Sequence, residues 1–384
     1  MRVDGERIER EASALAFPRY PGTEGDVRAI EMVAGWLREA GLEVSCEEFT
    51  YDIGPAFRAL RLLLLGTGLL VAVAGILAQP QPQVAASCLA LALLAGGTLL
   101  VWSPWLERLY SREGPTRTAN VIGRTGPRQP RLSLIFVAHH DSKSQNLPLP
   151  YRAGLTILTL LSGASLAVLL IVGLAMGQVG GPSWLGPLLG GLAAASLATL
   201  STLHNGNRSP GGVDNAGSVG VLMELARVLP GELPADVEAI FLSTGAEEDH
   251  MVGAMRWLDR HASLLAGRPT YALNLDGAGI PGKALLLERY GVGKSFSPFL
   301  SKMARRAAER LEIQIRGTPL PPALGVDAIP FIHRGIPCVT FASGSLGRAV
   351  VAIHSADDHA ENLDRDALER VAQLVAATAL DLTR

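Results

Sequence analysis

LSLIFVAHHDS, residues 132–142, joins a short apolar run to a group of polar side chains. An apolar run of this length, bounded by polar residues, is typical of a strand buried on both faces. Three later runs have the same character, and five segments have the apolar spacing of helices. The strand-like runs are Leu132–Val137, Val237–Leu242, Tyr271–Leu275 and Pro337–Phe341, and the helix-like segments are Val27–Ala40, Val213–Leu229, His250–Leu265, Lys294–Leu311 and Arg365–Leu382. Strands that alternate with helices predict an α/β fold, in which sites lie at the carboxyl ends of strands.

The composition indicates a soluble domain combined with membrane segments. Of the 384 residues, 48% are hydrophobic and only 18% are charged, which is too apolar for a wholly soluble enzyme. The formal net charge is −2, and no basic run is present, so nucleic acid is excluded as an expected partner. The three cysteines, Cys46, Cys88 and Cys338, form no CxxC pair and therefore predict neither a disulfide framework nor a thiolate metal site.

Four long apolar runs are expected to be membrane helices. Each is close to or above the roughly 18 residues that a span requires, and short uncharged links at 80–83 and 177–183 pair them into two helical hairpins. The runs are Leu62–Gln79, Val84–Trp102, Gly154–Met176 and Trp184–Leu203. The spans contain no charged residue to mark a solute path, which argues against a transporter.

The hairpins divide the chain into five segments. Hairpins at 62–102 and 154–203 interrupt a catalytic domain that comprises 1–61, 103–153 and 204–384. Each hairpin returns the chain to the side it left, so these three parts share one side of the membrane. Arginines flank the spans on that side, and the positive-inside rule predicts that it is the cytoplasmic side. We therefore expect a multi-pass protein in the plasma membrane of a bacterium. Small residues at 190–195 leave homo-oligomer formation through the membrane helices open.

Metal-capable side chains follow the predicted strands. His139, His140 and Asp141 follow the first strand, and Asp276 follows the third; Asp214, Glu247, Glu248 and His354 complete the set. Imidazole and carboxylate groups are the ligands that catalytic zinc prefers. Each residue alone could equally be a turn residue or a helix cap. Their joint occurrence, mostly at strand ends, favours a metal site.

Five ordered motifs resemble metallopeptidase family twenty-eight, the co-catalytic zinc aminopeptidases and their membrane-bound relatives. The motifs are AHHDS from residue 138, GGVDNAGSVGVLMELAR from 211, FLSTGAEED from 241, NLDGAG from 274 and IHSADDHAENLD from 353. The stretch Phe17–Thr23 and the segment Val326–Phe331 are also similar to that family. The resemblance covers the soluble part and none of the spans. It implies a mixed α/β sheet flanked by helices, of the zinc aminopeptidase type, with the two transmembrane hairpins inserted into it.

The resemblance also implies a site with two zinc ions per chain and a peptide substrate. His139 and Asp276 would bind one ion, Glu248 and His354 the other, and Asp214 would bridge the two. Asp141 would orient an imidazole ligand. Glu247 would be the general base that takes a proton from the attacking water. The implied activity is that of an aminopeptidase, which hydrolyses N-terminal peptide bonds.

Two departures and two alternatives remain. The family usually has a tyrosine where His140 stands, and often a histidine where Ala328 stands. Glutaminyl cyclases are also similar, and they bind one zinc through the equivalents of Asp214, Glu248 and His354. Their usual tryptophan is replaced by Ile353, which favours the peptidase. A membrane scaffold that has lost its chemistry is the alternative from another class, and the complete ligand set argues against it.

Overall fold

The computed structural model describes residues 2–97, 109, 112–127, 129–265, 267–291, 293–320, 324–344 and 352–384. These residues form two compact units. The first unit comprises 1–53, 104–144 and 206–384, and the second comprises 54–103 and 145–205.

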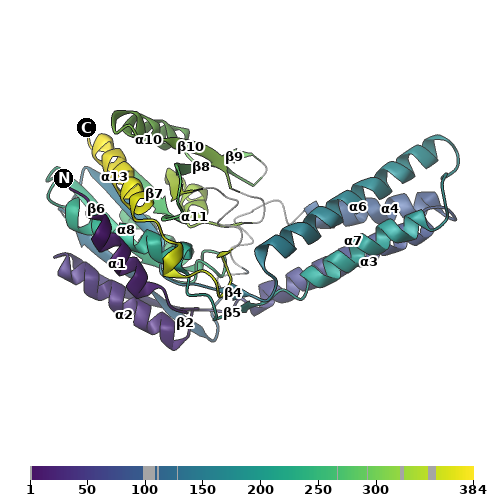
Figure 1. Ribbon diagram of the computed structural model, residues 1–384, viewed down its shortest axis with the longest axis horizontal. Helices are drawn as coiled ribbons and strands as arrows, with labels where there is room; N and C mark the ends of the chain where they lie inside the picture. Colours follow the sequence, from purple (N-terminus) through teal and green to yellow (C-terminus); the bar gives the residue numbers. More distant parts are fainter. Residues whose placement is uncertain are drawn as a thin grey trace. The chain divides into compact units, whose positions relative to one another are not determined.

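A nine-stranded mixed sheet forms the centre of the first unit (Figure 1). Its strands follow the order β1-β2-β6-β3-β7-β11-β8-β10, with β9 paired to β8. The four central strands β6, β3, β7 and β11 are parallel to one another. The bounds are β1 Glu43–Tyr51, β2 Thr116–Thr125, β3 Leu132–His139, β6 Val237–Thr244, β7 Thr270–Leu275, β8 Ala284–Tyr290, β9 Lys294–Ser295, β10 Ile315–Pro319 and β11 Cys338–Ser343.

The central strands are the four that the apolar runs predicted. β3, β6 and β11 are buried at every residue, because helices cover both faces of a parallel sheet. Of the remaining five strands, β8 begins with a buried apolar run at 284–287 that was not predicted as a strand. The other four have no comparable run. β1, for example, is exposed or half-buried along most of its length, and only Phe49 and Tyr51 are buried. The predicted helix Lys294–Leu311 is wrong at its start, where Lys294 and Ser295 form β9 before the helix begins.

Helices cover the two faces of this sheet unequally (Figure 1). One face packs against α2, α8, α10 and α13, and α1 packs in turn against α8 and α13. The apolar residues of these five helices share one core with the strands. The other face packs against α9 and α11. The bounds are α1 Gly5–Leu15, α2 Glu24–Glu39, α8 Gly217–Val228, α9 Val252–Leu265, α10 Pro298–Arg310, α11 Ala328–His333 and α13 Arg365–Leu382. Five of these correspond to predicted helical segments, while α1 and α11 were not predicted.

The second unit consists of apolar helices joined in two hairpins. α3 (Gly54–Leu77) turns back into α4 (Pro82–Gly97), and α6 (Leu149–Ala175) turns back into α7 (Leu185–Leu200). Within the unit, α3 packs against both α4 and α7, and α6 packs against α7 and α4. Outward-facing leucines and isoleucines on α3 and α6 are strongly exposed, for example Leu62 at 72% and Ile171 at 68%. An apolar surface of this kind is unusual in water.

The count of four spans is not confirmed. Among the described residues, two helices, α3 and α6, have both the length and the hydropathy to cross a membrane. The helices α4 and α7 are described over 16 residues each, which is shorter than a span requires. An apolar run in the sequence can exceed its helix: the run from 184 to 203 includes a turn after Leu200. The end of the run at 84–102 lies partly outside the described residues.

Candidate metal centre

Three parallel strands end at the same edge of the sheet, and each is followed by a predicted site residue. β3 ends at His139, β6 is followed by Glu247 and Glu248, and β7 is followed directly by Asp276. Because β3 lies between β6 and β7 in parallel register, the carboxyl ends of all three strands meet. The topology therefore brings four of the predicted residues together.

Two further residues reach the same place from loops. Asp214 lies in a short irregular turn, Gly212–Ala216, that precedes α8. The backbone N–H groups of Val213 and Asp214 donate to the carboxylate of Asp358 at 2.8 and 3.1 Å, and these bonds fix the turn. His354 approaches from the loop before α13 in a left-handed conformation, with φ of 62°. Tertiary contacts, not local propensity, hold both loops in position.

Five of these side chains form two groups that share Asp214. His139 Nε2 lies 3.2 Å from Asp214 Oδ1 and 3.9 Å from Asp276 Oδ1. On the other side, His354 Nε2 lies 3.2 Å from Asp214 Oδ2 and 3.1 Å from Glu248 Oε2. In each group the donor atoms lie within 4.8 Å of one another. The two carboxylate oxygens of Asp214 thus face two different histidines.

The donor chemistry fits a pair of zinc ions. Imidazole and carboxylate donors converge in each group, and both are ligand types found at catalytic zinc sites. Burial raises the pKa of Asp276 well above its usual range; the charge of His139 lowers it, but the charges of Asp214 and Asp327 raise it further. Buried carboxylates held this close repel one another, and a divalent cation between them would offset that repulsion.

Glu247 is buried beside the first group. Its Oε2 atom lies 3.8 Å from His139 Nε2, and its side chain is 8% exposed. Burial raises the pKa of Glu247 well above its usual range, although the charge of His139 lowers it. A carboxyl with a raised pKa next to a metal-capable cluster is suited to accept and return a proton.

Asp141 contacts more of the site than the His-x-Asp spacing predicts. Its Oδ1 atom lies 3.5 Å from His139 Nδ1, which also contacts the backbone oxygen of Asp141 at 3.2 Å. The same carboxylate accepts the backbone N–H groups of Glu247 and Glu248 at 3.2 and 3.1 Å. Asp141 therefore holds the loop that carries both glutamates, in addition to its contact with His139.

His140 points away from the donor groups. Its Nδ1 atom lies 3.1 Å from Ser243 Oγ, and its Nε2 atom lies 3.8 Å from Asp26 Oδ1. Burial lowers the pKa of His140 to about 4. His140 thus contacts Ser243 and lies near Asp26, and it belongs to neither donor group.

A buried arginine that the sequence did not single out connects two of the loops. Arg19 is completely buried, and its guanidinium donates to the backbone oxygens of Phe17, His140, Pro210 and Gly211. These bonds tie the segment after β3 to the segment before Asp214. In the sequence, only its position in the stretch Phe17–Thr23 could have indicated that Arg19 belongs to the site region.

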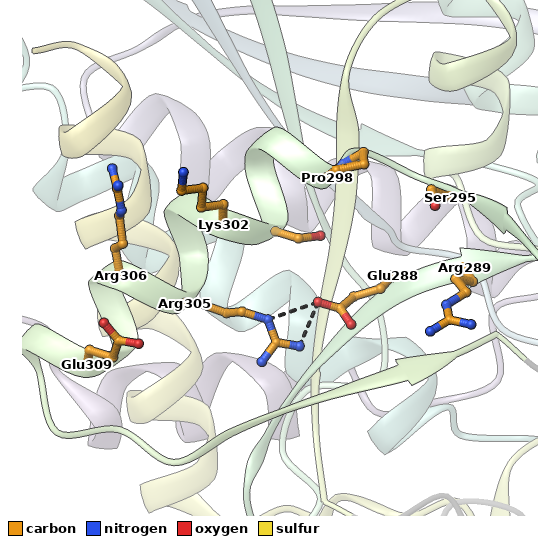
Figure 2. Close-up of a pocket in the computed structure, with 9 residues that line it drawn as sticks. Glu288, Arg289, Ser295, Pro298, Lys302, Arg305, Arg306 and Glu309 are labelled. Atoms are coloured by element: carbon orange, nitrogen blue, oxygen red, sulfur yellow. Dashed lines mark hydrogen bonds and ion pairs between the residues drawn. The ribbon is translucent and has the colours of Figure 1, made fainter.

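One groove lies away from this centre (Figure 2). It is bounded by α10 and β8, and the ion pair between Arg305 and Glu288 crosses it at 2.6 Å. Its lining residues include none of the side chains in the two donor groups. The groove therefore has no part in the metal site.

Sequence and structure matches identify relatives of this chain. Residues 193–379 match the model of peptidase family M28. The aminopeptidase YwaD of Bacillus subtilis is 26% identical over 178 residues, which are 46% of this chain and 38% of that protein. The chain thus spans well under half the length of this curated relative.

Solved structures share the fold across almost the whole chain. A zinc aminopeptidase from Bacillus subtilis matches with a TM-score of 0.59 and 15% identity, covering 99% of this chain and 96% of that chain. A glutaminyl cyclase from Fimbriiglobus ruber matches with a TM-score of 0.58 and 14% identity, covering 99% and 96%. At these identities the likeness concerns the fold, a mixed α/β sheet flanked by helices.

Proposed function

We propose that the chain is a zinc-dependent aminopeptidase, because residues 193–379 match the model of peptidase family M28. The observation that carries the proposal is the pair of donor groups that share Asp214, with buried Glu247 beside them. Two relatives of this chain are aminopeptidases by name, one matched by sequence and one by fold. The substrate would be the N-terminal end of a peptide.

In this proposal His139, Asp214 and Asp276 hold one zinc, and Asp214, Glu248 and His354 hold a second. Zinc in such a site acidifies a coordinated water and stabilises developing negative charge. Glu247 accepts the proton of the attacking water and returns it to the leaving amine, so the base becomes the acid within one turnover. Asp141 keeps Glu247 in place through its bond to the Glu247 backbone N–H.

We further propose that the second unit anchors the enzyme in a membrane. Support comes from the length and hydropathy of α3 and α6 and from the exposed apolar side chains on their outer faces. The residues assigned to the catalytic domain are 1–61, 103–153 and 204–384, and they would face the cytoplasm. The helices α4 and α7 would return the chain to that side.

A glutaminyl cyclase is the second candidate. Two observations favour it: the fold shared with the cyclase from Fimbriiglobus ruber, and the donor group Asp214, Glu248 and His354. Against it, the first donor group is also complete, and Ile353 stands where cyclases carry a tryptophan. An inactive scaffold would have no need for either group.

Zinc content measured with substrate cleavage distinguishes these functions. The purified chain should hold zinc and release the N-terminal residue from aminoacyl substrates, and it should leave glutaminyl substrates uncyclised. Glu247→Gln should keep the zinc and lower kcat by at least about 100-fold, because only the proton acceptor is lost. Cyclisation of glutaminyl substrates would support the second candidate. If zinc-loaded protein cleaves nothing, and Glu247→Gln changes nothing, the proposed activity is wrong.

A further inference from the structure

A lysine side chain lies against one donor group of the candidate centre. Lys143 Nζ is 2.8 Å from Glu248 Oε2 and donates to the backbone oxygen of Glu248 at 2.9 Å. The backbone N–H of Lys143 donates to the other carboxylate oxygen, Glu248 Oε1, at 3.1 Å. One residue therefore contacts both oxygens of Glu248, and its side chain is only 14% exposed.

The ammonium group binds the same oxygen that faces the histidine. Glu248 Oε2 is the atom that lies 3.1 Å from His354 Nε2, so it is the oxygen placed to coordinate a metal in this group. The lysine charge thus lies within a few ångströms of the space between Asp214, Glu248 and His354. Because this environment is largely buried, water screens the charge poorly.

The other donor group has a negatively charged neighbour instead of a positively charged one. His139, Asp214 and Asp276 have Glu247 as a close neighbour, with Glu247 Oε2 at 3.8 Å from His139 Nε2. In the part of the chain that the structure describes, no lysine or arginine forms an ion pair with Asp276 or Asp214. The charge of Lys143 also acts on Glu247 and on the shared Asp214. Its direct ion pair, however, is with Glu248 of the second group, while the first group has the carboxylate of Glu247 beside it.

We propose that Lys143 makes the two zinc positions unequal, so that zinc binds first at His139–Asp214–Asp276 and more weakly at Asp214–Glu248–His354. The inference deepens the proposed function and rests on it, because it assumes that these donors bind zinc. A single positive charge at this distance in a partly buried site should weaken binding of a dication by at least about tenfold. The lysine would thereby set the zinc concentration at which the second position fills.

Metal titration of the full-length chain in detergent tests the proposal. Apoprotein is titrated with zinc against a chromophoric chelator, and bound zinc is counted by elemental analysis. The wild type should show two affinities separated by at least about tenfold. Lys143→Met, which keeps the unbranched stem and removes the charge, should tighten the weaker site by about tenfold and leave the tighter one within about threefold.

Lys143→Arg is the matched control, since it keeps the charge and should keep the separation between the two affinities. His354→Ala assigns the positions: the tight zinc should remain in this variant and the weak zinc should be lost. The proposal is wrong if Lys143→Met leaves the weaker affinity unchanged or weakens it, or if His354→Ala removes the tight zinc. Hydrolysis by the wild type at saturating zinc is measured separately, so failure of the proposed function is recognised independently of the order of binding.

Discussion

At the scale of the residue, the candidate centre depends on carboxylates that each contact more than one part of the site. Asp141 lies within 3.5 Å of the ring of His139 and also accepts the backbone N–H groups of Glu247 and Glu248. Asp214 presents one oxygen to each histidine. Carboxylates suit this role because both oxygens accept bonds in different directions. A change at either residue therefore affects more than one part of the site.

Replacing Asp214 with asparagine should remove both zinc ions. The amide offers one oxygen where the carboxylate offers two, and it lacks the negative charge that two dications would share. We expect zinc content close to zero, measured by elemental analysis, and a loss of kcat/KM greater than about 100-fold. Asp357→Asn serves as the control, because Asp357 is exposed and should be neutral. Full activity in Asp214→Asn would contradict the bridging role.

Asp26 should make the stability of the fold depend on pH. Burial raises its pKa from 3.8 to about 7, although bonds from the Gly22 N–H and the Thr118 hydroxyl lower it. Between these two values the folded state retains a proton that the unfolded state has released, so stability falls as pH rises from about 4 to about 7. Thermal unfolding at about pH 5 and about pH 8 should therefore show a smaller loss of Tm in Asp26→Asn than in the wild type. Equal losses in the two proteins would show that Asp26 does not carry this dependence.

At the scale of the element, strand ends and helix contacts decide where side chains meet. The parallel strands β6, β3 and β7 deliver their following residues to one edge of the sheet. In the second unit, α3 and α7 approach closely through glycines. A Cβ atom at Gly190 would lie 2.8 Å from the Val71 backbone oxygen and 3.0 Å from the Cα of Gly75. These glycines pack inside the unit, where Gly190 contacts α3. Gly190 therefore does not face a second copy of the chain, although the sequence left open that small residues at 190–195 form an oligomer interface.

Gly190→Ala should destabilise the helical unit, and Gly191→Ala should not. The added methyl at position 190 meets the α3 backbone, and such overpacking costs about 1–3 kcal/mol. A Cβ at Gly191 meets nothing within 4 Å, so there the better helix propensity of alanine should add roughly 0.5–1 kcal/mol. Thermal unfolding in detergent compares the two variants. The same effect in both would mean that α3 and α7 do not pack through this contact.

At the scale of the whole molecule, the chain interrupts one unit to build another. The first unit is made of three separate segments, and the second is made of the two hairpins between them. The pairing of β4 (Ser144–Gln145) with β5 (Asn205–Gly206) brings together the points where the chain leaves for the second hairpin and returns from it. The residues of the candidate metal centre thus come from both sides of an insertion, which requires the insertion to begin and end at neighbouring positions.

Reporter fusions test the proposed orientation of the anchored chain. Fusions at residues 81 and 180, in the two hairpin tips, should report an extracytoplasmic location, because arginines flank the apolar helices at their other ends. A fusion at the C-terminus should report a cytoplasmic location and serves as the reference. Cytoplasmic signals from the tips would reverse the orientation or show that the hairpins do not cross.

The sequence by itself determined the central strands and most of the helices. Periodicity and apolar runs report local burial, and burial is uniform along β3, β6 and β11. It did not determine the edge strands, such as β1 and β10, whose pairing depends on a neighbour distant in the chain. Apolar length alone also overestimated α7, which ends at Leu200 although the apolar run continues to Leu203.

For the site, the sequence supplied the residue types and their order, and only the tertiary structure decided their grouping. Strand order places His139 beside Asp276, and the loop before α13 brings His354 to Glu248. The contacts of Arg19 and Lys143 also arise only from folding, because their partners lie about a hundred or more positions away. Local patterns record which face of an element is buried. They carry no record of which buried charges will lie next to each other.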